Sequence, residues 1–336
     1  MKTVSFQRVP TWLGALALGV GLWTTPVEAQ SPIMIKYNHV VPANTAKGRA
    51  ATLFAKLANE RLAGRVKVEV YPNAQLYEED AAFQALILGD IQMSAPSMAK
   101  TGPFTKKLQV FDLPFLFDDV AAVDRFQRSA KGREILDSMV SKGLKGLSFG
   151  REGMKQLQAK KPLHVPNDAN GLKFRIMASD VLVAQTQAVG GFPQKLAFAE
   201  VYNALQTGVI DAHENTWSLI WSKKFFETAK YITESNHGIL DYVVITNAKF
   251  WAGLPADIRT GLESIMKEVM LIEYEEAAME TAGDRQKIID TGKAEIIQLK
   301  PEERALWRKA MQPVWQKFEK EIGRDVIEAA KNSNKN

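Results

Sequence analysis

Arg175 is the side chain of this sequence whose type and position best suit the binding of a small anion. It belongs to the segment 172–176, in which apolar residues alternate with lysine and arginine. This period of two is typical of a β-strand with one buried face, so Arg175 stands on the face opposite the core. A guanidinium held on a rigid strand presents two parallel N–H groups that match a carboxylate. The segment therefore predicts an anion-binding arginine, and a surface ion pair is the alternative.

Asn215 is a second candidate because of the elements that precede it. Residues 198–206 have helical spacing, Gly208 ends this helix, and a short apolar strand begins at Val209. Asn215 comes at the carboxyl end of that strand. In open α/β sheets, ligand-binding groups gather at such strand ends. An asparagine there can both donate and accept a hydrogen bond.

Two further patterns suggest catalysis but lack the context that it requires. Ser148 is the centre of a Gly-x-Ser-x-Gly motif, whose nucleophilic serine must stand at a sharp turn from strand to helix. Here Ser148 falls inside a predicted strand, 144–149. His213 and Glu214 suggest the start of a zinc-protease helix, but Trp217 occupies the position of the second ligand. We therefore expect no enzyme activity, no metal and no cofactor, and keep a periplasmic serine hydrolase using Ser148 as a remote alternative.

The amino-terminal residues 1–29 have the organisation of a secretory signal peptide. A basic start is followed by an apolar run at 12–23 and by small residues before Ala29, so we expect cleavage after Ala29. The apolar run is shorter than the ~20 residues that a membrane span needs. The sequence contains no cysteine, which excludes a lipid-anchoring cysteine and a disulfide framework. These features predict a free periplasmic protein.

The charge of the chain is modest and evenly spread. Its 336 residues include 43 lysines and arginines and 38 acidic residues, a formal net charge of +5. Basic and acidic residues are interspersed, which argues against nucleic acid as a partner. A mild positive balance raises the local concentration of small anions. The chain is long enough for two domains with cores of their own.

Strands and helices alternate through the first third of the chain. The pattern predicts strands at 33–39, 66–71 and 91–95 and helices at 46–62 and 78–88. This order favours parallel strands joined by right-handed helical crossovers, and hence an α/β fold. Further helices are predicted at 121–142 and 255–291, the latter about 50 Å long at 1.5 Å per residue.

Two motifs connect the chain with a known family. The first is Gly-Leu-Lys-Phe-Arg at 171–175, and the second is Phe-Ala-Glu-Val-Tyr-Asn-Ala-Leu-Gln-Thr-Gly-Val-Ile-Asp at 198–211, followed by Glu-Asn at 214–215. Together, and at this spacing, they resemble the signature region of the DctP-type solute receptors of TRAP (tripartite ATP-independent periplasmic) transporters. The resemblance extends from about Ile33 to the last helix.

This resemblance implies a two-domain α/β fold, the Venus-flytrap arrangement of periplasmic binding proteins, with a long helix that spans both domains. It places residues 30–152 and 241–280 in the first domain and residues 153–240 and 281–336 in the second. The segment before them, 1–29, is the signal peptide. The ligand is expected in the cleft between the two domains.

The resemblance also implies ligand contacts. Asn215 matches the family's ligand-binding asparagine, and Phe198 matches an aromatic residue that walls the cleft. Lys155 stands where many relatives carry a second cationic contact, an arginine, and Arg151 is a nearby substitute. His39 aligns with a ligand-facing strand end.

Four more residues are candidates because of their places in the chain. Lys47 lies near the start of a predicted helix, where anions are favoured, and is our candidate for a second carboxylate. Ser97 follows the third strand. Trp217 and Tyr242 would close the pocket, although aromatic side chains suit a core equally well.

The resemblance is greatest to receptors for C4-dicarboxylates such as succinate, fumarate and malate. It implies a monomer that captures its ligand and delivers it to a TRAP permease with a small and a large membrane subunit. Two alternatives stay open within the same fold. The ligand could be another organic acid (a 2-oxo acid, an aldonate or a uronate), or the receptor could report to a sensor kinase.

Overall fold

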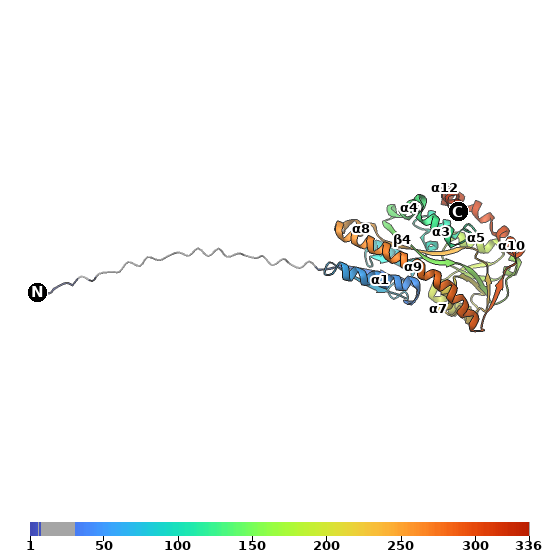
Figure 1. Cartoon of the computed structure of the whole chain (residues 1–336), viewed down its shortest axis with the longest axis horizontal. Coiled ribbons are helices and arrows are strands. Elements are labelled where there is room, and N and C mark those ends of the chain that lie inside the picture. Colours follow the sequence, from blue (N-terminus) through green and yellow to red (C-terminus); the bar gives the residue numbers. More distant parts are fainter. Residues whose placement is uncertain (6, 8–30, 336) are drawn as a thin grey trace. The chain divides into compact units, whose positions relative to one another are not determined.

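The computed structural model describes residues 1–5, 7 and 31–335, and Figure 1 labels several of its helices and one strand, β4. The predicted signal peptide and its cleavage after Ala29 lie largely outside the described residues. The chain divides into residues 1–31 and residues 32–336, and the description that follows concerns the second unit. In the part of the chain that the structure describes, no helix combines the length and the hydropathy needed to cross a membrane.

The first sheet has five strands in the order β2-β1-β3-β10-β4. They span Ile33–Asn38 (β1), Val66–Tyr71 (β2), Met93–Ser94 (β3), Leu144–Met154 (β4) and Ile239–Asn247 (β10). Strands β1, β2 and β3 are parallel, as the alternation of strands and helices predicts. Strand β10 is antiparallel to both β3 and β4. A segment far along the chain therefore completes the sheet that the first third begins.

The second sheet has six strands in the order β11-β9-β5-β8-β6-β7. They span Gln156–Ala159 (β5), Lys173–Ile176 (β6), Phe192–Lys195 (β7), Ala212–Asn215 (β8), Tyr231–Glu234 (β9) and Glu295–Gln298 (β11). The predicted arginine strand is β6, which lies parallel to β8 with Arg175 opposite His213. Side chains on one face of neighbouring strands are close, so this register brings the two sequence motifs together.

Two short crossings join the sheets at adjacent places, and the two helices that follow β10 form a third, longer connection from the first sheet to β11 of the second. Strand β4 of the first sheet ends at Met154, and β5 of the second begins at Gln156. The return crossing joins β9 to β10 through residues 235–238. The backbone N–H of Lys155 donates to the carbonyl of Gly238 at 2.8 Å, so a hydrogen bond ties the two crossings together.

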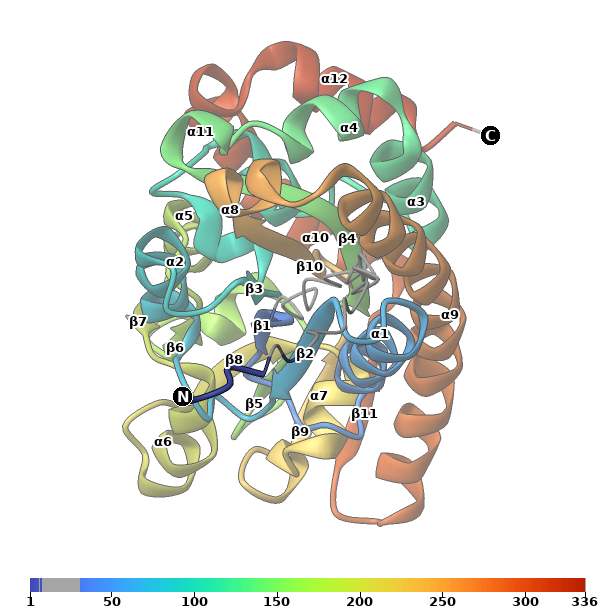
Figure 2. The same cartoon turned by 90° about the vertical axis from the view of Figure 1, so that its left-hand side faces the viewer.

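Helices cover both sheets. They span Ala46–Arg61 (α1), Glu79–Leu88 (α2), Val120–Arg128 (α3), Ala130–Leu136 (α4), Asp180–Ala188 (α5), Val201–Thr207 (α6), Trp217–Ser222 (α7), Ala248–Gly253 (α8), Ala256–Asp290 (α9), Pro301–Met311 (α10), Pro313–Ile322 (α11) and Arg324–Asn332 (α12). The predicted long helix is α9, which has 35 residues. Figure 2 shows α9 running along one side of the molecule, where it packs against α1 and α7.

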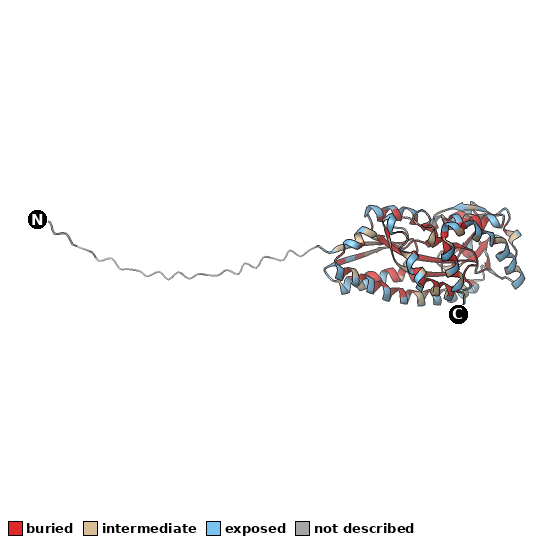
Figure 3. Ribbon diagram, turned by 90° about the horizontal axis from the view of Figure 1, so that it is seen from above, coloured by how far each residue is buried: buried red, intermediate tan, exposed pale blue. Residues whose placement is uncertain are grey.

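Buried residues form separate apolar clusters around the two sheets, and Figure 3 shows buried strands under helices whose outer faces are exposed. One cluster joins Phe126 of α3 and Val243 of β10 to Phe318 of α11 and Val326 of α12. The last two helices thus pack on elements attached to the first sheet. The domain limits expected from the family resemblance stay a prediction.

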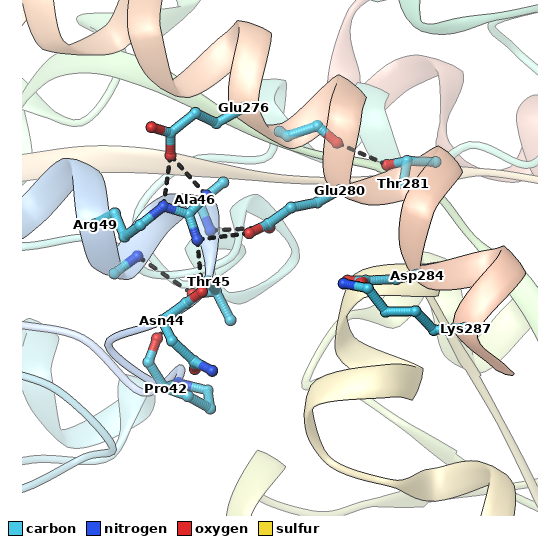
Figure 4. A network of polar contacts seen from close by, with 12 residues as sticks. Pro42, Asn44, Thr45, Ala46, Arg49, Glu276, Glu280, Thr281, Asp284 and Lys287 are labelled. Carbon is cyan, nitrogen blue, oxygen red and sulfur yellow. Dashed lines mark hydrogen bonds and ion pairs between the residues drawn. The ribbon is translucent and has the colours of Figure 1, made fainter. Parts of the chain in front are cut away.

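A polar network fastens the start of α1 to α9 (Figure 4). The Ala46 backbone N–H donates to Glu280 at 3.0 Å, and the Arg49 guanidinium forms ion pairs with Glu280 at 2.7 Å and Glu276 at 2.6 Å. The hydroxyl of Thr45 accepts from the Gly48 N–H and caps the helix. The loop that precedes α1 is therefore fixed to the long helix, and this loop begins beside the candidate site.

Candidate functional site

A cavity of about 300 Å³ lies between elements of the two sheets. Segments around β1, α2, β3 and β10 supply one part of its wall, and β6, β8 and α7 with their flanking residues supply the other. The lining residues are Val40, Val41, Glu79, Ser97, Arg175, Met177, Phe198, Asn215, Leu219, Leu240 and Tyr242. Five of the ten residues expected to bind ligand thus share one cavity: Ser97, Arg175, Phe198, Asn215 and Tyr242.

The cation of this cavity is Arg175, which β6 holds with only 3% of its surface exposed. Its Nε donates to the Leu196 carbonyl at 3.1 Å. Burial lowers the pKa of Arg175 to about 10, so the group stays charged at neutral pH, and the carboxylates that act on it do so only from a distance. Among residues 31–335, no carboxylate forms an ion pair with it. Buried charges in proteins are normally paired. A guanidinium in this state is suited to an incoming anion.

Asn215 offers a second donor to the same cavity. It ends β8, and it lies two residues beyond His213, the partner of Arg175 in the sheet register. Asn215 and Arg175 therefore project from the same face of the sheet. The Asn215 Nδ2 is buried without a hydrogen-bond acceptor among the described residues, whereas its Oδ1 accepts from the Thr216 N–H. An unsatisfied buried donor costs free energy unless a ligand or water accepts from it.

The other walls are mostly apolar, with few polar groups. The Phe198 ring packs edge-on against Phe225 at 5.9 Å between centroids, so it serves both the wall and the core. The Ser97 N–H donates to Glu79 at 3.0 Å, which fixes the turn after β3. Burial, with the nearby Glu152 carboxyl, raises the pKa of Tyr242, so its hydroxyl stays protonated. Ser97 and Tyr242 are the hydroxyl-bearing residues of this lining.

Lys47 and His39 are not part of this lining. The Lys47 Nζ donates to the Ala95 carbonyl at 2.9 Å and sits 3.2 Å from the centre of the Tyr242 ring. Burial lowers the pKa of Lys47 to about 8. It lines a neighbouring cavity of about 220 Å³, which Tyr242 shares with the first cavity. Burial and the Lys47 charge lower the pKa of His39 to about 3, so this ring is neutral.

The structure does not bring Lys155 to the cavity. Its Nζ is fully buried against Glu214 at 2.5 Å, and Glu214 also accepts from His237 at 2.8 Å and Gln185 at 2.7 Å. Burial by itself would raise the pKa of Glu214, but Lys155 and His237 hold it well below the usual range. Successive side chains of a strand point to opposite faces, so Glu214 points away from the face of Asn215. Lys155 lies on the same side as Glu214 and is not part of the lining of this cavity.

Arg151 and Trp217 are also placed elsewhere. The Arg151 guanidinium forms an ion pair with Asp124 and stacks over Tyr274, 4.4 Å from the ring centre. Both Arg151 and Trp217 line a different cavity of about 720 Å³ beside α9. The Trp217 ring there faces the Arg285 guanidinium at 5.6 Å. The expected contacts of these two residues with the ligand find no support in this arrangement.

Several lining residues were not foreseen from the sequence. Glu79 stands in the first turn of α2, and Leu219 stands in α7. Val40, Val41, Met177 and Leu240 lie just after or within strands. Each is of a residue type that is common in cores or at helix starts, so no local sequence signal marks it as a residue of the cavity. These residues become neighbours only through the pairing of distant segments.

Two sheets joined by short crossings, with a cavity between them in which a buried donor lacks a partner among the described residues, are consistent with the class of solute-binding proteins. The family model for DctP, bacterial extracellular solute-binding protein, family 7, matches residues 37–321. The chain belongs to this family of TRAP periplasmic solute-binding proteins, as the two sequence motifs predict.

Named relatives and solved structures are consistent with this family. The chain is 51% identical over 303 residues to the C4-dicarboxylate-binding periplasmic protein DctP of Vibrio cholerae, covering 90% of this chain and 91% of the relative. A TRAP solute-binding protein of Shewanella oneidensis with bound succinate superposes with a TM-score of 0.89 at 49% identity, covering 91% of this chain and 100% of the other. One of Pseudomonas aeruginosa with bound L-malate gives 0.83 at 47% identity, covering 85% and 100%. The predicted α/β fold class is confirmed.

Proposed function

We propose that this protein captures a C4-dicarboxylate in the cavity at Arg175 and passes it to a TRAP permease. The observation that carries the proposal is the buried Arg175 guanidinium, which faces an enclosed cavity without a carboxylate partner among the described residues. The names and bound ligands of the relatives support the choice of acid, because succinate and L-malate occupy two similar proteins.

One carboxylate of the ligand would bind the two outer N–H groups of Arg175 in parallel. Asn215 would donate a further hydrogen bond through the Nδ2 that lacks an acceptor. Hydrogen bonds to charged groups contribute ~1.5–3 kcal/mol each, so this end supplies most of the directional binding energy. The planar fork of arginine also fixes the plane of the carboxylate.

The second carboxylate would meet the opposite part of the lining. Ser97 and Tyr242 supply hydroxyl groups there, and Lys47 supplies positive charge from behind the Tyr242 ring. The four-carbon spacing of the acid separates the two charges, and the small cavity favours a short molecule. These features favour a short dicarboxylate over an aldonate, a uronate or another larger acid.

Capture requires the cavity to open, because its lining residues are buried. We infer that the two sheets separate to admit the ligand and that contacts from both sides favour closure. The small and large membrane subunits of the permease would recognise the closed monomer. Export through the predicted signal peptide would place the protein in the periplasm.

This role needs no catalysis. Ser148 lies within β4 and donates its hydroxyl to the Phe149 carbonyl at 2.9 Å, instead of standing at a strand-to-helix turn. The cavity that Ser148 lines has no histidine among its residues. A serine hydrolase therefore has no support from the geometry, and we propose a receptor without enzyme activity.

Thermal shift measurements with a panel of acids test the proposal. Succinate, fumarate and L-malate should stabilise the protein, and at 100 times the dissociation constant by about 2.7 kcal/mol. Gluconate, glucuronate and 2-oxobutyrate should do so less. Arg175→Ala should abolish the shift, whereas Lys173→Ala on the same strand should keep it, because the Lys173 Nζ is bonded to the Gly208 carbonyl.

The proposal fails in two ways that this experiment separates. An unchanged succinate shift in Arg175→Ala would remove Arg175 from the site. A larger shift with gluconate or glucuronate than with every C4-dicarboxylate would overturn the choice of ligand.

A further inference from the structure

A larger cavity lies at the free edge of the first sheet, away from the cleft. It is partly open to solvent, and it is formed by β4, which is an edge strand, together with α3, α4, α8 and α9. It shares no lining residue with the cavity at Arg175. We call it the β4-edge cavity. Its apolar lining includes Leu136, Leu147, Phe149, Trp251, Met270 and Leu271.

Three cationic side chains also line the β4-edge cavity: Arg128, Arg133 and Lys267. All three residues are exposed, and none forms an ion pair with a carboxylate in the part of the chain that the structure describes. Lys131, which like Arg133 lies in α4, is paired with Glu134 at 2.5 Å. The Arg133 Nη1 donates to the Arg128 carbonyl at 2.5 Å, but no carboxylate of the described residues neutralises the three charges, so they can attract an anion from solution.

One acidic residue, Glu263, belongs to this lining, and it has a partner. Its Oε1 accepts from the Trp251 indole N–H at 3.2 Å. The same bond satisfies the polar atom of the largest buried ring in the wall. Glu263 therefore leaves a net positive charge around an apolar interior.

An apolar cavity edged by unpaired cations matches a molecule with an acidic head and an apolar chain. Ligand pockets of ~300–1,000 Å³ are mostly apolar and use a few charged groups to orient the ligand. A small inorganic anion would leave the apolar walls unused, and a neutral hydrocarbon would leave the cations unused. We propose that the β4-edge cavity is a second binding site, which takes an amphiphilic carboxylate with its chain against β4 and its head among Arg128, Arg133 and Lys267.

Three probes with the same chain test this site by isothermal titration calorimetry. Decanoate, decanamide and decylamine carry a negative, a neutral and a positive head, and each is used below its micelle concentration. Decanoate should bind at least tenfold more tightly than the other two. Equal binding of decanamide, or no binding of decanoate, would overturn the proposal.

Variants then locate the binding. Arg133→Glu combined with Lys267→Glu should weaken decanoate at least tenfold while succinate binding is retained, which also shows that the protein is folded. The matched control is Lys309→Glu with Lys317→Glu, two exposed lysines outside this lining. Retained decanoate binding in the first variant would overturn the assignment.

Two further variants test whether the β4-edge cavity and the cavity at Arg175 are distinct binding sites. Ser148→Phe places a ring into the β4-edge cavity and should weaken decanoate binding but not succinate binding. Arg175→Ala should do the reverse. If Arg175→Ala abolished decanoate binding, the fatty acid would be assigned to the cavity at Arg175, and the proposal of a second site would be refuted.

Discussion

Arg175 and Lys155 are both buried cations attached to the second sheet, and both were expected to hold the ligand. Their surroundings in the structure differ. Arg175 faces a cavity and has no carboxylate partner among the described residues, whereas Lys155 is bound to Glu214 at 2.5 Å. Sequence position and residue type do not separate the two. What distinguishes them is whether a carboxylate is paired with the cation, because a buried cation that is already paired has no charge left for a ligand.

The surroundings of the two cations strengthen this contrast. Glu214 is held by Lys155, His237 and Gln185, so its acceptor capacity is used within the protein. Gly238 lies against Lys155, and a Cβ at this glycine would come within 2.8 Å of the lysine side chain. The surroundings of Lys155 are closely packed, whereas Arg175 borders a cavity.

The largest expected effect comes from breaking the Lys155 pair. Lys155→Ala would leave the Glu214 carboxylate buried without its main partner, and removal of one member of a buried pair costs about 3–5 kcal/mol. Chemical denaturation without ligand should show this loss. Arg175→Ala, the matched change at the cavity, should alter the unfolding free energy by no more than about 1 kcal/mol, since it removes one hydrogen bond.

A double variant sharpens the same comparison. Lys155→Met with Glu214→Leu replaces both charges by apolar groups and should recover most of the stability that Lys155→Ala loses. A double variant as unstable as the single one would contradict a role of Lys155 that rests on pairing.

The next effect concerns ligand affinity. Arg175→Lys keeps the charge but loses the planar fork, so succinate should bind about 10–100-fold more weakly, equivalent to roughly 1.4–2.7 kcal/mol. Isothermal titration calorimetry measures this loss of affinity. Lys155→Arg is the counterpart: it should leave the succinate enthalpy and affinity nearly unchanged if the protein stays folded, and a strong gain in affinity would return residue 155 to the pocket.

The pH dependence of stability should also distinguish two buried carboxyls. Burial raises the pKa of Glu152 to about 7 from its usual 4.5, although Lys47 and the Thr216 hydroxyl oppose the shift. Between these values the folded protein holds more protons than the unfolded chain, so the contribution of Glu152 falls as pH rises. Glu214 has a lowered pKa, so its stabilisation is complete above pH 4.5 and is lost as pH falls.

Denaturation at several pH values checks this difference. Glu152→Gln should reduce the decline of the unfolding free energy between pH 4.5 and about 7. Glu214→Gln should weaken the loss of stability on acidification below pH 4.5. Identical pH profiles for the wild type and both variants would contradict the two assignments.

The smallest effect is expected at the network between α1 and α9. Arg49 is 40% exposed and pairs with Glu276 and Glu280. Exposed ion pairs contribute ~0.2–1 kcal/mol, so Arg49→Ala should lower the melting temperature by only a few degrees. A loss as large as that of Lys155→Ala would show that this network, too, belongs to the structural core.

Local patterns predicted the elements well. The alternation at 172–176 corresponds to β6 at Lys173–Ile176, and the long tract at 255–291 corresponds to α9 at Ala256–Asp290. These elements follow from side-chain periodicity, which neighbouring residues determine. The helix predicted at 121–142 is divided at Ser129, whose hydroxyl caps α4 by accepting from the Gly132 N–H at 3.0 Å. A serine within an apolar pattern gives only a weak signal of such a break.

The site was predictable only in part. Periodicity places Arg175 on one face of a strand, and the structure shows that this face borders a cavity. The same reasoning cannot show that Glu214 lies beside Lys155, because residues 59 positions apart meet only after β5 pairs with β8. Glu79 was missed for the same reason. Tertiary pairing of distant residues decides which charges are used within the protein and which remain for a ligand.

The hydrogen bond between Lys155 and Gly238 has a mechanical consequence. It joins the two short crossings between the sheets, so these two segments turn together, while α9 forms the third and longer connection. We therefore expect the molecule to open by rotation about one axis through these residues, and not by independent sliding of its halves. A rotation of this kind is described by a single angle. A ligand that contacts the residues of both sheets is therefore enough to determine how far the protein closes.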